Sequence, residues 1–316
     1  MKNRLLKLLC CPKCKADLGI RKSKSAKSEI ESGILHCPVC QREYQIINFI
    51  PRFVSTDKYV ESFSFEWKIH KKTQLDSATG KTESKVTFIQ KIGTKVENLR
   101  NKIVLDVGCG MGRFMEVVQP YAKEVIGIDL SFAVDSAHEN LKKFDNVHFI
   151  QADVFNLPLK NNTFDYIYSI GVLHHTPDTK RAFMKLPCIL KSGGEIAIWV
   201  YSDETGYTRI RNRFTDFYRI FTTHLPKKLL WYLSHLAIPF YYCKKISKVG
   251  AFLDLVFPTS NHPVIEWRVL DTFDWYSPKY QRKHTRDEVI NWFKEAGLKD
   301  IEASDFPVAV KGRKRK

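Results

Sequence analysis

Five short apolar runs recur between residues 102 and 201, and a polar or helix-like stretch separates each run from the next. The runs are KIVLDVG, EVIGIDL, NVHFIQAD, FDYIYSIG and GEIAIWVY. Strands that alternate with helices in this way build a parallel sheet that is covered on both faces. The sequence therefore predicts a doubly wound α/β fold. In such a fold a ligand binds at the carboxyl ends of the first two strands.

The first run is followed by a glycine-rich turn, Asp106-Val-Gly108-Cys-Gly110-Met-Gly112. Glycine is needed where the backbone must turn sharply and approach a ligand without a Cβ atom in between. The dinucleotide-binding fingerprint has the spacing G-x-G-x-x-G. Here the spacing is G-x-G-x-G, with an acid two residues before the first glycine. This pattern favours a ligand that has no phosphates and carries a positive amino group.

Two further acids follow strands of the predicted sheet. Asp129 ends the second run, 21 residues after Gly108, where a carboxylate can accept hydrogen bonds from both hydroxyls of a ribose. Asp153 follows the third run, where it can meet the amino group of an adenine. The turn and the two acids together predict a nucleoside-containing ligand.

These segments resemble the motifs of class I S-adenosylmethionine-dependent methyltransferases, nearest to the ubiquinone-biosynthesis-like group. The matching stretches are LDVGCGMGRF, IGIDLS, QADVFNLPL, FDYIYSIGVLHHTPD and KSGGEIAIWV, and HTRDEVINWFKEAGLKDIEAS resembles the closing helix and strand pair. The resemblance implies a mostly parallel sheet of seven strands and S-adenosylmethionine as the cofactor. It also implies that the cofactor contacts Asp106, Gly108 and Gly110 with its methionine part, Asp129 with its ribose, and Leu130, Asp153 and Val154 with its adenine. Gly112 is predicted to be a further cofactor-binding residue.

Methyl transfer by in-line displacement needs aligned reactants in a dry cavity, and it needs a base only if the acceptor must lose a proton early. His174 and His175 follow the fourth run, at the expected mouth of the cavity. Either could orient or deprotonate an acceptor, and His175 matches the usual position in the family. The alternative is that both are hydrogen-bonded loop histidines.

Two cysteine pairs, Cys11-Pro-Lys-Cys14 and Cys37-Pro-Val-Cys40, lie near the start of the chain. Two CxxC turns at this separation predict a tetrahedral zinc site, and four thiolates leave no open position for catalysis. Disulfides are the alternative, but they would imply secretion. The elements CPKC, CPVC and YQIINFIP resemble the zinc-ribbon family that includes the activator subunit of certain tRNA methyltransferases. Residues 20–33, between the pairs, are predicted to be an exposed loop.

Two aromatic segments are not required by the core fold. In the first, Phe63, Phe65 and Trp67 alternate, so they either close over the cofactor or form a strand on the sheet. The second, residues 203–284, contains LLWYLSHLAIPFYYC between lysine pairs, which suits a membrane interface or, alternatively, a packed helical cap. Its last part is our candidate for acceptor recognition, with Trp267, Arg268, Asp271, Asp274, Trp275, Tyr276 and Tyr280.

The net charge of +17 lies outside the predicted core: it is +7 over residues 1–60, −1 over 101–200 and +6 over 203–285. Basic flanks favour contact with a polyanion or an anionic membrane surface. We expect methyl transfer to a small, glycan or lipid-linked acceptor, by a cytoplasmic protein or one peripheral to the cytoplasmic membrane face. The alternatives are an RNA methyltransferase acting on tRNA or rRNA, and a non-catalytic zinc-ribbon binding or activator protein.

The predicted organisation has five parts. They are a zinc-ribbon module (1–54), a linker and helical cap (55–100), the cofactor-binding core (101–202), a helical acceptor-binding insertion (203–284) and a final helix, strand pair and basic tail (285–316).

Overall fold

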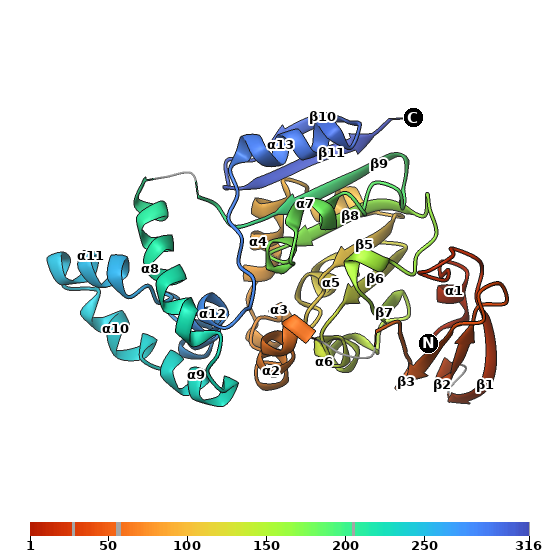
Figure 1. Cartoon of the computed structure of the whole chain (residues 1–316), viewed down its shortest axis with the longest axis horizontal. Helices are drawn as coiled ribbons and strands as arrows, with labels where there is room; N and C mark the ends of the chain where they lie inside the picture. The colour runs from red at the N-terminus through yellow and green to blue at the C-terminus, as the bar shows by residue number, and fades with distance from the viewer. Residues whose placement is uncertain (27–28, 55–57, 204–205, 316) are drawn as a thin grey trace.

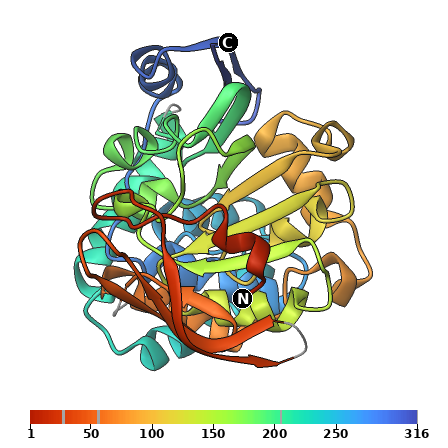
Figure 2. The same cartoon turned by 90° about the vertical axis from the view of Figure 1, so that its right-hand side faces the viewer.

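The computed structural model describes residues 1–26, 29–54, 58–203 and 206–315 of the chain. Across these ranges a single sheet of 11 strands runs in the order β1-β2-β3-β4-β7-β6-β5-β8-β9-β11-β10. Figure 1 shows a small N-terminal unit at one end of the molecule, the sheet with its covering helices in the middle, and helices α8 to α12 at the other end. Figure 2 looks onto the N-terminal unit and shows its strands in front of the central sheet.

The central part of the sheet has seven strands, of which β11 alone runs antiparallel to its neighbours β9 and β10. The seven are β5 (Ile103–Val107), β6 (Glu124–Asp129), β7 (Val147–Gln151), β8 (Phe164–Ile170), β9 (Leu190–Trp199), β10 (Leu298–Ala303) and β11 (Ala309–Lys314). The predicted doubly wound, mostly parallel seven-stranded sheet is therefore confirmed.

Helices cover both faces of this sheet. They are α4 (Glu83–Ile92), α5 (Arg113–Val118), α6 (Ala133–Leu141), α7 (Thr179–Phe183) and α13 (Arg286–Glu295). Successive residues of β5 pack in opposite directions: Val104 joins a cluster with Phe88 of α4, whereas Leu105 joins a cluster with Phe183 of α7. Burial on both faces is the reason why the strands are continuously apolar rather than alternating.

The N-terminal unit contains α1 (Asn3–Leu6), β1 (Gly19–Ala26), β2 (Glu29–His36), β3 (Glu43–Ile47) and β4 (Ile50–Arg52). These four strands pair antiparallel, and β4 then pairs with β7 through Arg52 and Gln151, so the unit extends the central sheet. The predicted loop at residues 20–33 is wrong, because most of it forms the β1–β2 pair; residues 27–28 at its tip lie outside the described residues. An exposed edge hairpin can consist of polar residues, since neither face must be buried.

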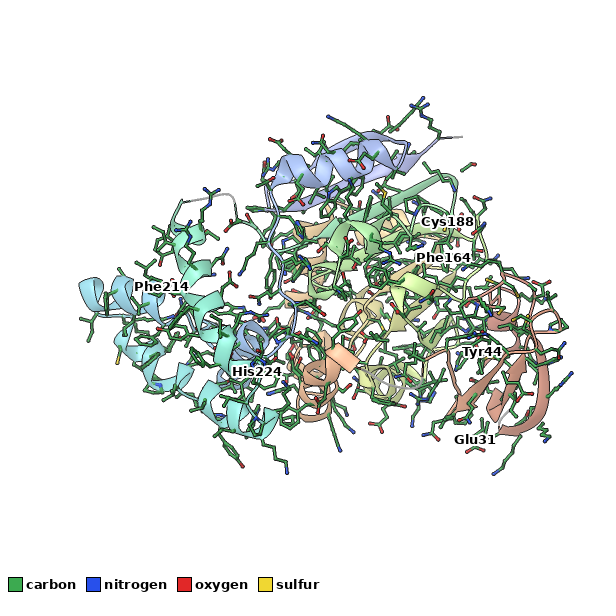
Figure 3. All side chains as sticks on the ribbon, viewed as in Figure 1. Glu31, Tyr44, Phe164, Cys188, Phe214 and His224 are labelled. Atoms are coloured by element: carbon green, nitrogen blue, oxygen red, sulfur yellow. The ribbon has the colours of Figure 1, made fainter. Side chains whose placement is uncertain are left out.

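Most of the remaining helical elements follow or pass over the carboxyl ends of the central strands, whereas η2 (Val96–Leu99) precedes the amino end of β5. The other elements are η1 (Lys58–Val60), α2 (Glu61–Ile69), α3 (Asp76–Thr79), η3 (Val154–Asn156), η4 (Leu173–His175), α8 (Gly206–Thr222), α9 (Lys227–Ser234), α10 (Ala237–Cys243), α11 (Ser247–Val256) and α12 (Ile265–Tyr276). In Figure 3, Phe214 and His224 mark helix α8 and the turn that follows it, while Glu31 and Tyr44 mark the N-terminal unit at the other end.

Phe63, Phe65 and Trp67 belong to helix α2, so the strand alternative for them is wrong. Alternating aromatic residues are typical of a strand, but they also fit a helix. In a helix Phe63 and Trp67, four residues apart, share one face, and Phe65 points to another. Phe65 accordingly packs against Phe273 of α12, with ring centroids 5.7 Å apart, whereas the other two line a cavity. None of the described helices is both long enough and apolar enough to cross a bilayer.

Candidate cofactor and acceptor site

A cavity of about 570 Å³ opens where β5, β6 and β8 end and where helices α2 and α12 pass over them. Of the residues predicted to bind the cofactor or to act in catalysis, the cavity lining includes Gly108, Gly110, Asp129, Leu130, Val154 and His175. Asp106, Gly112 and Asp153 lie close by in the chain but are not part of the lining. The structure thus gathers most of the predicted site residues around one hollow.

The glycine-rich turn has the geometry that its sequence predicts. Gly108, Gly110 and Gly112 have φ values of 81°, 51° and 90°, which lie in the region that disfavours other residues. A Cβ atom on Gly108 would lie 2.2 Å from Cγ1 of Val172. The backbone N–H of Gly108 donates to the carbonyl oxygen of Ile128 at 2.8 Å, which ties the turn to the end of β6. Space and conformation both require glycine at position 108.

Asp129 lies at the end of β6 and holds the turn in place. One carboxylate oxygen accepts the backbone N–H of Gly110 at 2.8 Å, and the other accepts the backbone N–H and the hydroxyl of Ser131 at 2.8 Å and 2.6 Å. Burial raises the pKa of Asp129, and these hydrogen bonds oppose that shift. Since a carboxylate offers about four acceptor positions, roughly one remains for a ligand.

Asp106 and Asp153 also have hydrogen-bond partners within the protein, and Gly112 faces a neighbouring side chain. Asp106 is buried on β5 and accepts a hydrogen bond from the Tyr168 hydroxyl at 3.0 Å; burial raises its pKa to about 8, which that bond opposes. Asp153 caps η3 by accepting the N–H of Phe155 at 2.9 Å. A Cβ on Gly112 would lie 2.8 Å from Cδ1 of Leu141. Their role as cofactor ligands stays a prediction.

Helix α2 contributes cavity residues to which sequence reasoning gave no definite role. The indole nitrogen of Trp67 would lie 3.3 Å from a Cβ on Gly110, so the ring covers the glycine-rich turn. Phe63 meets the imidazole of His175 edge-on, with ring centroids 5.1 Å apart. Tyr59, just before the helix, also lines the cavity. The signal that could have found Phe63 and Trp67 together is their i, i+4 spacing.

His175 has one engaged and one unengaged ring nitrogen. Nδ1 lies 2.8 Å from the carbonyl oxygen of Tyr280, which can only accept, so Nδ1 carries the proton. Nε2 is buried and has no partner among the described residues. Burial lowers the pKa of the imidazole. A neutral ring with its lone pair on Nε2 is the state that a general base needs. His174 instead stacks on Tyr201, 3.9 Å between centroids.

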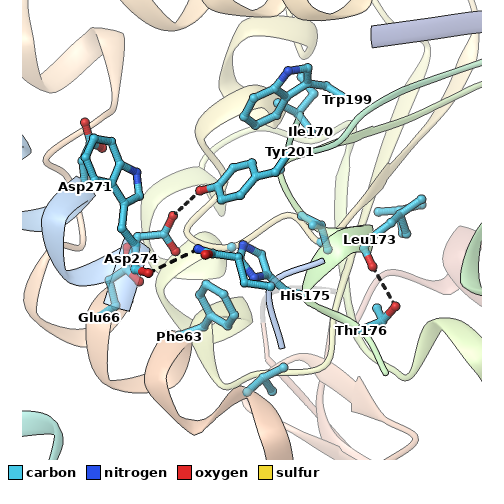
Figure 4. Close-up of a pocket in the computed structure, with 18 of the residues that line it drawn as sticks. Phe63, Glu66, Ile170, Leu173, His175, Thr176, Trp199, Tyr201, Asp271 and Asp274 are labelled. Carbon is cyan, nitrogen blue, oxygen red and sulfur yellow. Dashed lines mark hydrogen bonds between the residues drawn. The ribbon is translucent and has the colours of Figure 1, made fainter. Parts of the chain in front are cut away.

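Three carboxyl groups line the cavity, and Figure 4 shows Glu66 and Asp274 toward His175 and Asp271 farther from it. Glu66 comes from α2, and Asp271 and Asp274 come from α12. Asp274 accepts a hydrogen bond from the Tyr201 hydroxyl at 3.0 Å, and Asp271 accepts one from the Ser260 hydroxyl at 3.0 Å. Burial raises the pKa of Asp271 to about 7 and that of Glu66 well above its usual value.

Only some residues of the candidate acceptor segment at 267–280 line the cavity. Asp271, Asp274 and Trp275 line the cavity. Trp267, Arg268, Tyr276 and Tyr280 are not in its lining; the guanidinium of Arg268 instead lies 3.6 Å from the ring centroid of Tyr241. The residues that face the cavity are one turn apart on α12, as side chains on one face of a helix must be.

Basic side chains line the same cavity. They are Lys91, Arg113, Arg211 and Lys283. Burial lowers the pKa of Lys91 to about 7, and its ammonium lies 3.4 Å from the ring centroid of Trp199. The cavity therefore combines carboxyl groups and cations, and it is not uniformly of one charge.

The four predicted zinc ligands lie together in the N-terminal unit. The Sγ atoms of Cys11, Cys14, Cys37 and Cys40 are all within 4.8 Å of one another, and the closest pairs are 3.4 Å and 3.5 Å apart. A zinc ion with four thiolates at about 2.3 Å needs sulfur atoms roughly 3.8 Å apart, so the cluster fits zinc. Cys10 does not belong to it.

The zinc-ribbon unit also contacts the segment that follows β7. The N–H of Cys10 donates to the carbonyl oxygen of Pro158 at 2.9 Å, and the ammonium of Lys15 donates to that of Leu157 at 2.7 Å. Leu9 and Leu159, both fully buried, form a β-bridge there. A folded ribbon therefore fixes the backbone a few residues beyond Val154, which lines the cavity.

Comparison with protein families supports this geometry. A family described as "Methyltransferase domain" matches residues 105–198, and a family described as "Trm112p-like protein" matches residues 2–48. The chain carries a methyltransferase domain. The predicted combination of an S-adenosylmethionine-dependent methyltransferase domain with an N-terminal zinc ribbon is thereby confirmed.

Curated relatives match the methyltransferase domain and differ in what their names say they act on. A probable S-adenosylmethionine-dependent methyltransferase of Saccharomyces cerevisiae is 36% identical over 121 residues, 37% of this chain and 38% of that protein. The tRNA U34 carboxymethyltransferase of Campylobacter fetus is 34% identical over 129 residues, 36% of this chain and 45% of that protein. The chain thus spans less than half the length of these relatives.

Solved structures give a weaker likeness. A complex that contains the Trm112 methyltransferase activator of Haloferax volcanii covers 81% of this chain and 98% of that chain, at 14% identity and a TM-score of 0.48. A methyltransferase of Thermotoga maritima covers 82% and 97%, at 15% identity and a TM-score of 0.45.

Proposed function

We propose that this chain transfers a methyl group from S-adenosylmethionine to RNA. The observation that carries the methyl-transfer part is the cavity at the glycine-rich turn, with Asp129 beside it, inside a methyltransferase domain. The cavity is concave, lined by aromatic rings and a few polar groups, and lies at the carboxyl ends of parallel strands, as small-molecule sites in such folds do.

In this proposal Gly108 and Gly110 would hold the methionine part of the cofactor, and Trp67 would cover it. Asp129, which can take about one further hydrogen bond, would hold the ribose, and Leu130 and Val154 would hold the adenine. Asp153 caps the turn that presents Val154. Asp106 supports the glycine-rich turn and does not bind the cofactor directly, because its carboxyl group accepts a hydrogen bond from Tyr168 on the neighbouring strand.

The chemistry is an in-line displacement. The acceptor atom forms a bond to the methyl carbon, the bond from that carbon to sulfur breaks, and the sulfur keeps the electron pair and loses its charge. His175 takes the proton that the acceptor loses, through Nε2, which is unprotonated and unpartnered among the described residues. The protein otherwise contributes alignment and exclusion of water. The four-cysteine cluster holds the ribbon together and takes no part in this step.

RNA is the acceptor that the comparisons support best. Several curated relatives are named tRNA U34 carboxymethyltransferases, at 33% to 34% identity. A net charge of +17 suits a polyanionic partner, and Arg211 places part of that charge at the cavity itself. This reverses the order that the sequence alone favoured, in which RNA was the alternative.

A small or lipid-linked acceptor is the second candidate, and one observation favours it. Helices α8 to α11 expose large apolar side chains, which include Phe217, Ile220, Phe221, Leu229, Tyr232, Leu233, Leu236, Tyr242 and Phe252. An apolar patch of this kind suits an amphipathic molecule or a bilayer interface.

One labelling experiment separates these functions. The protein is incubated with methyl-labelled S-adenosylmethionine and, separately, with RNA, lipid and polar-metabolite extracts. We expect label in the RNA, and a His175→Gln variant serves as the low-activity control. Label in the lipid fraction alone would favour the second candidate. Cofactor binding without label in any fraction would favour a non-catalytic role.

A further inference from the structure

The strongest unexplained feature of the cavity is the carboxyl group of Glu66. Its residue is 1% exposed, and neither carboxyl oxygen has a hydrogen-bond partner among the described residues. Buried polar groups in folded proteins are nearly always paired, and a carboxyl group is among the costliest to leave unpaired. Glu66 also lines the cavity. Its missing partner is therefore best sought in a molecule that enters the cavity.

Asp271 and Asp274 extend this carboxyl group into a small cluster. Each has one described hydrogen bond, to the hydroxyls of Ser260 and Tyr201. Among the described residues, none of the three acids forms an ion pair within 4.0 Å, although four basic side chains line the same cavity. The cations of the protein therefore do not pair with these acids, and carboxyl oxygens remain available as acceptors for a donor from outside.

Tyr201 connects this cluster to the reacting centre. Its hydroxyl binds Asp274, and its ring meets that of His175 with centroids 5.5 Å apart. Phe63 touches His175 from α2, the helix that carries Glu66. A group held by Glu66 and Asp274 would therefore lie next to His175, where the acceptor must be.

The walls of the cavity indicate the shape of that group. Phe63, Trp67, Tyr201 and Trp275 line it, and aromatic rings of this kind stack on planar ligands. Arg211 lies over the ring of Trp275, 5.3 Å from its centroid. A free cationic amine would meet these cations unfavourably, whereas a nucleotide brings a neutral planar base together with a phosphate.

We propose that Glu66 and Asp274 form the acceptor subsite and bind the exocyclic amino group of a nucleobase. The idea rests on the proposed function and narrows it. Adenine, cytosine and guanine carry an exocyclic amino group, whereas uracil does not. The subsite therefore selects against uridine, so the methylated base differs from the uridine for which the carboxymethyltransferase relatives are named. Arg211 holds the adjoining phosphate.

The direct test is calorimetric titration of the protein, saturated with S-adenosylhomocysteine, with AMP, CMP, GMP and UMP. We expect at least one amino-bearing nucleotide to bind tenfold or more tightly than UMP. Glu66→Met should abolish that preference, and Glu66→Gln, which keeps a carbonyl acceptor, should lose less. Glu61→Gln, on the exposed side of the same helix, is the matched control and should behave as wild type. Ethanolamine, a small cationic amine, is titrated as well. The proposal would be overturned if UMP bound as tightly as the other nucleotides, or if ethanolamine bound more tightly than any nucleotide.

A second measurement distinguishes a failure of the proposed subsite from a failure of the proposed function. Glu66→Met removes an unpaired buried carboxyl, so we expect it to unfold at higher urea than wild type and to bind the cofactor normally, while it labels RNA at least tenfold more slowly. Cofactor binding without labelling of RNA by wild type contradicts the proposed function. Labelling of RNA by Glu66→Met at the wild-type rate overturns the subsite alone.

Discussion

Gly108 should tolerate no side chain, and Gly108→Ala is the sharpest probe of the turn at the end of β5. The φ value of 81° is unfavourable for alanine, and the new Cβ would lie 2.2 Å from Cγ1 and 2.4 Å from Cγ2 of Val172. Val172 cannot easily rotate away, because a β-branched side chain has few χ1 rotamers. The turn or the start of η4 must then move.

The cost has two parts. A non-glycine residue in the left-handed region costs roughly 1–2 kcal/mol. Forcing a methyl group into occupied space costs about 1–3 kcal/mol more. Gly108→Ala should therefore lower the free energy of unfolding by about 2–5 kcal/mol. Gly80, at the end of α3, has a similar φ of 68° and no atom within 4 Å of its Cβ position, so Gly80→Ala should show only the first part.

Urea unfolding of the two variants and of wild type measures this difference, and calorimetry measures S-adenosylmethionine binding in parallel. Gly108→Ala should also weaken the cofactor, whereas Gly80→Ala should not. The double variant Gly108→Ala/Val172→Ala should lose less stability than the sum of the losses in the two single variants, since removing the Val172 methyl groups relieves the clash. Equal destabilisation by Gly108→Ala and Gly80→Ala would show that the clash with Val172 adds nothing, which would refute the reasoning.

Four further predictions address the remaining site residues. Asp129→Ala should weaken S-adenosylmethionine by about 10-fold or more in calorimetric titration, because a charge-assisted hydrogen bond contributes about 1.5–3 kcal/mol. Cys37→Ser should reduce bound zinc, measured by metal analysis, from one equivalent towards none and unfold mainly the ribbon, whereas Cys188→Ser, an exposed lone thiol, should not. His175→Gln should slow methyl transfer by about 10²–10⁴-fold, in a rate assay, with little change in cofactor affinity. Asp106→Asn should flatten the dependence of stability on pH in urea unfolding. The pKa of the wild-type carboxyl is raised by burial to about 8 against 3.8 unfolded, so its contribution is fully present below pH 3.8 and is lost as pH rises to about 8.

Each of these has an outcome that contradicts it. Unchanged cofactor affinity in Asp129→Ala would remove that residue from the site. A disulfide between Cys11 and Cys14 in the native protein would exclude the zinc assignment. A normal rate for His175→Gln would leave it a structural histidine. Weaker cofactor binding in Asp106→Asn, with no change in the pH profile, would restore Asp106 as a direct ligand.

The sequence by itself determined the features that depend on local spacing. Five continuous apolar runs indicated strands buried on both faces, and glycines at alternate positions indicated a turn with positive φ values. Cys11, Cys14, Cys37 and Cys40 were identified as one metal site, because two short turns can present four thiolates to one ion without any knowledge of the rest of the fold. These inferences succeeded because the interactions behind them are made within a few residues.

Only the tertiary structure decided the features that join distant segments. Glu66 and Asp271 are about 200 residues apart in the chain, and no periodicity connects them; they meet because α2 and α12 both pass over the same strand ends. The pairing of β4 with β7, which fuses the ribbon to the central sheet, was likewise not predicted. Backbone hydrogen bonds between strands are nearly independent of side-chain identity, so an edge pairing of this kind leaves almost no trace in a single sequence.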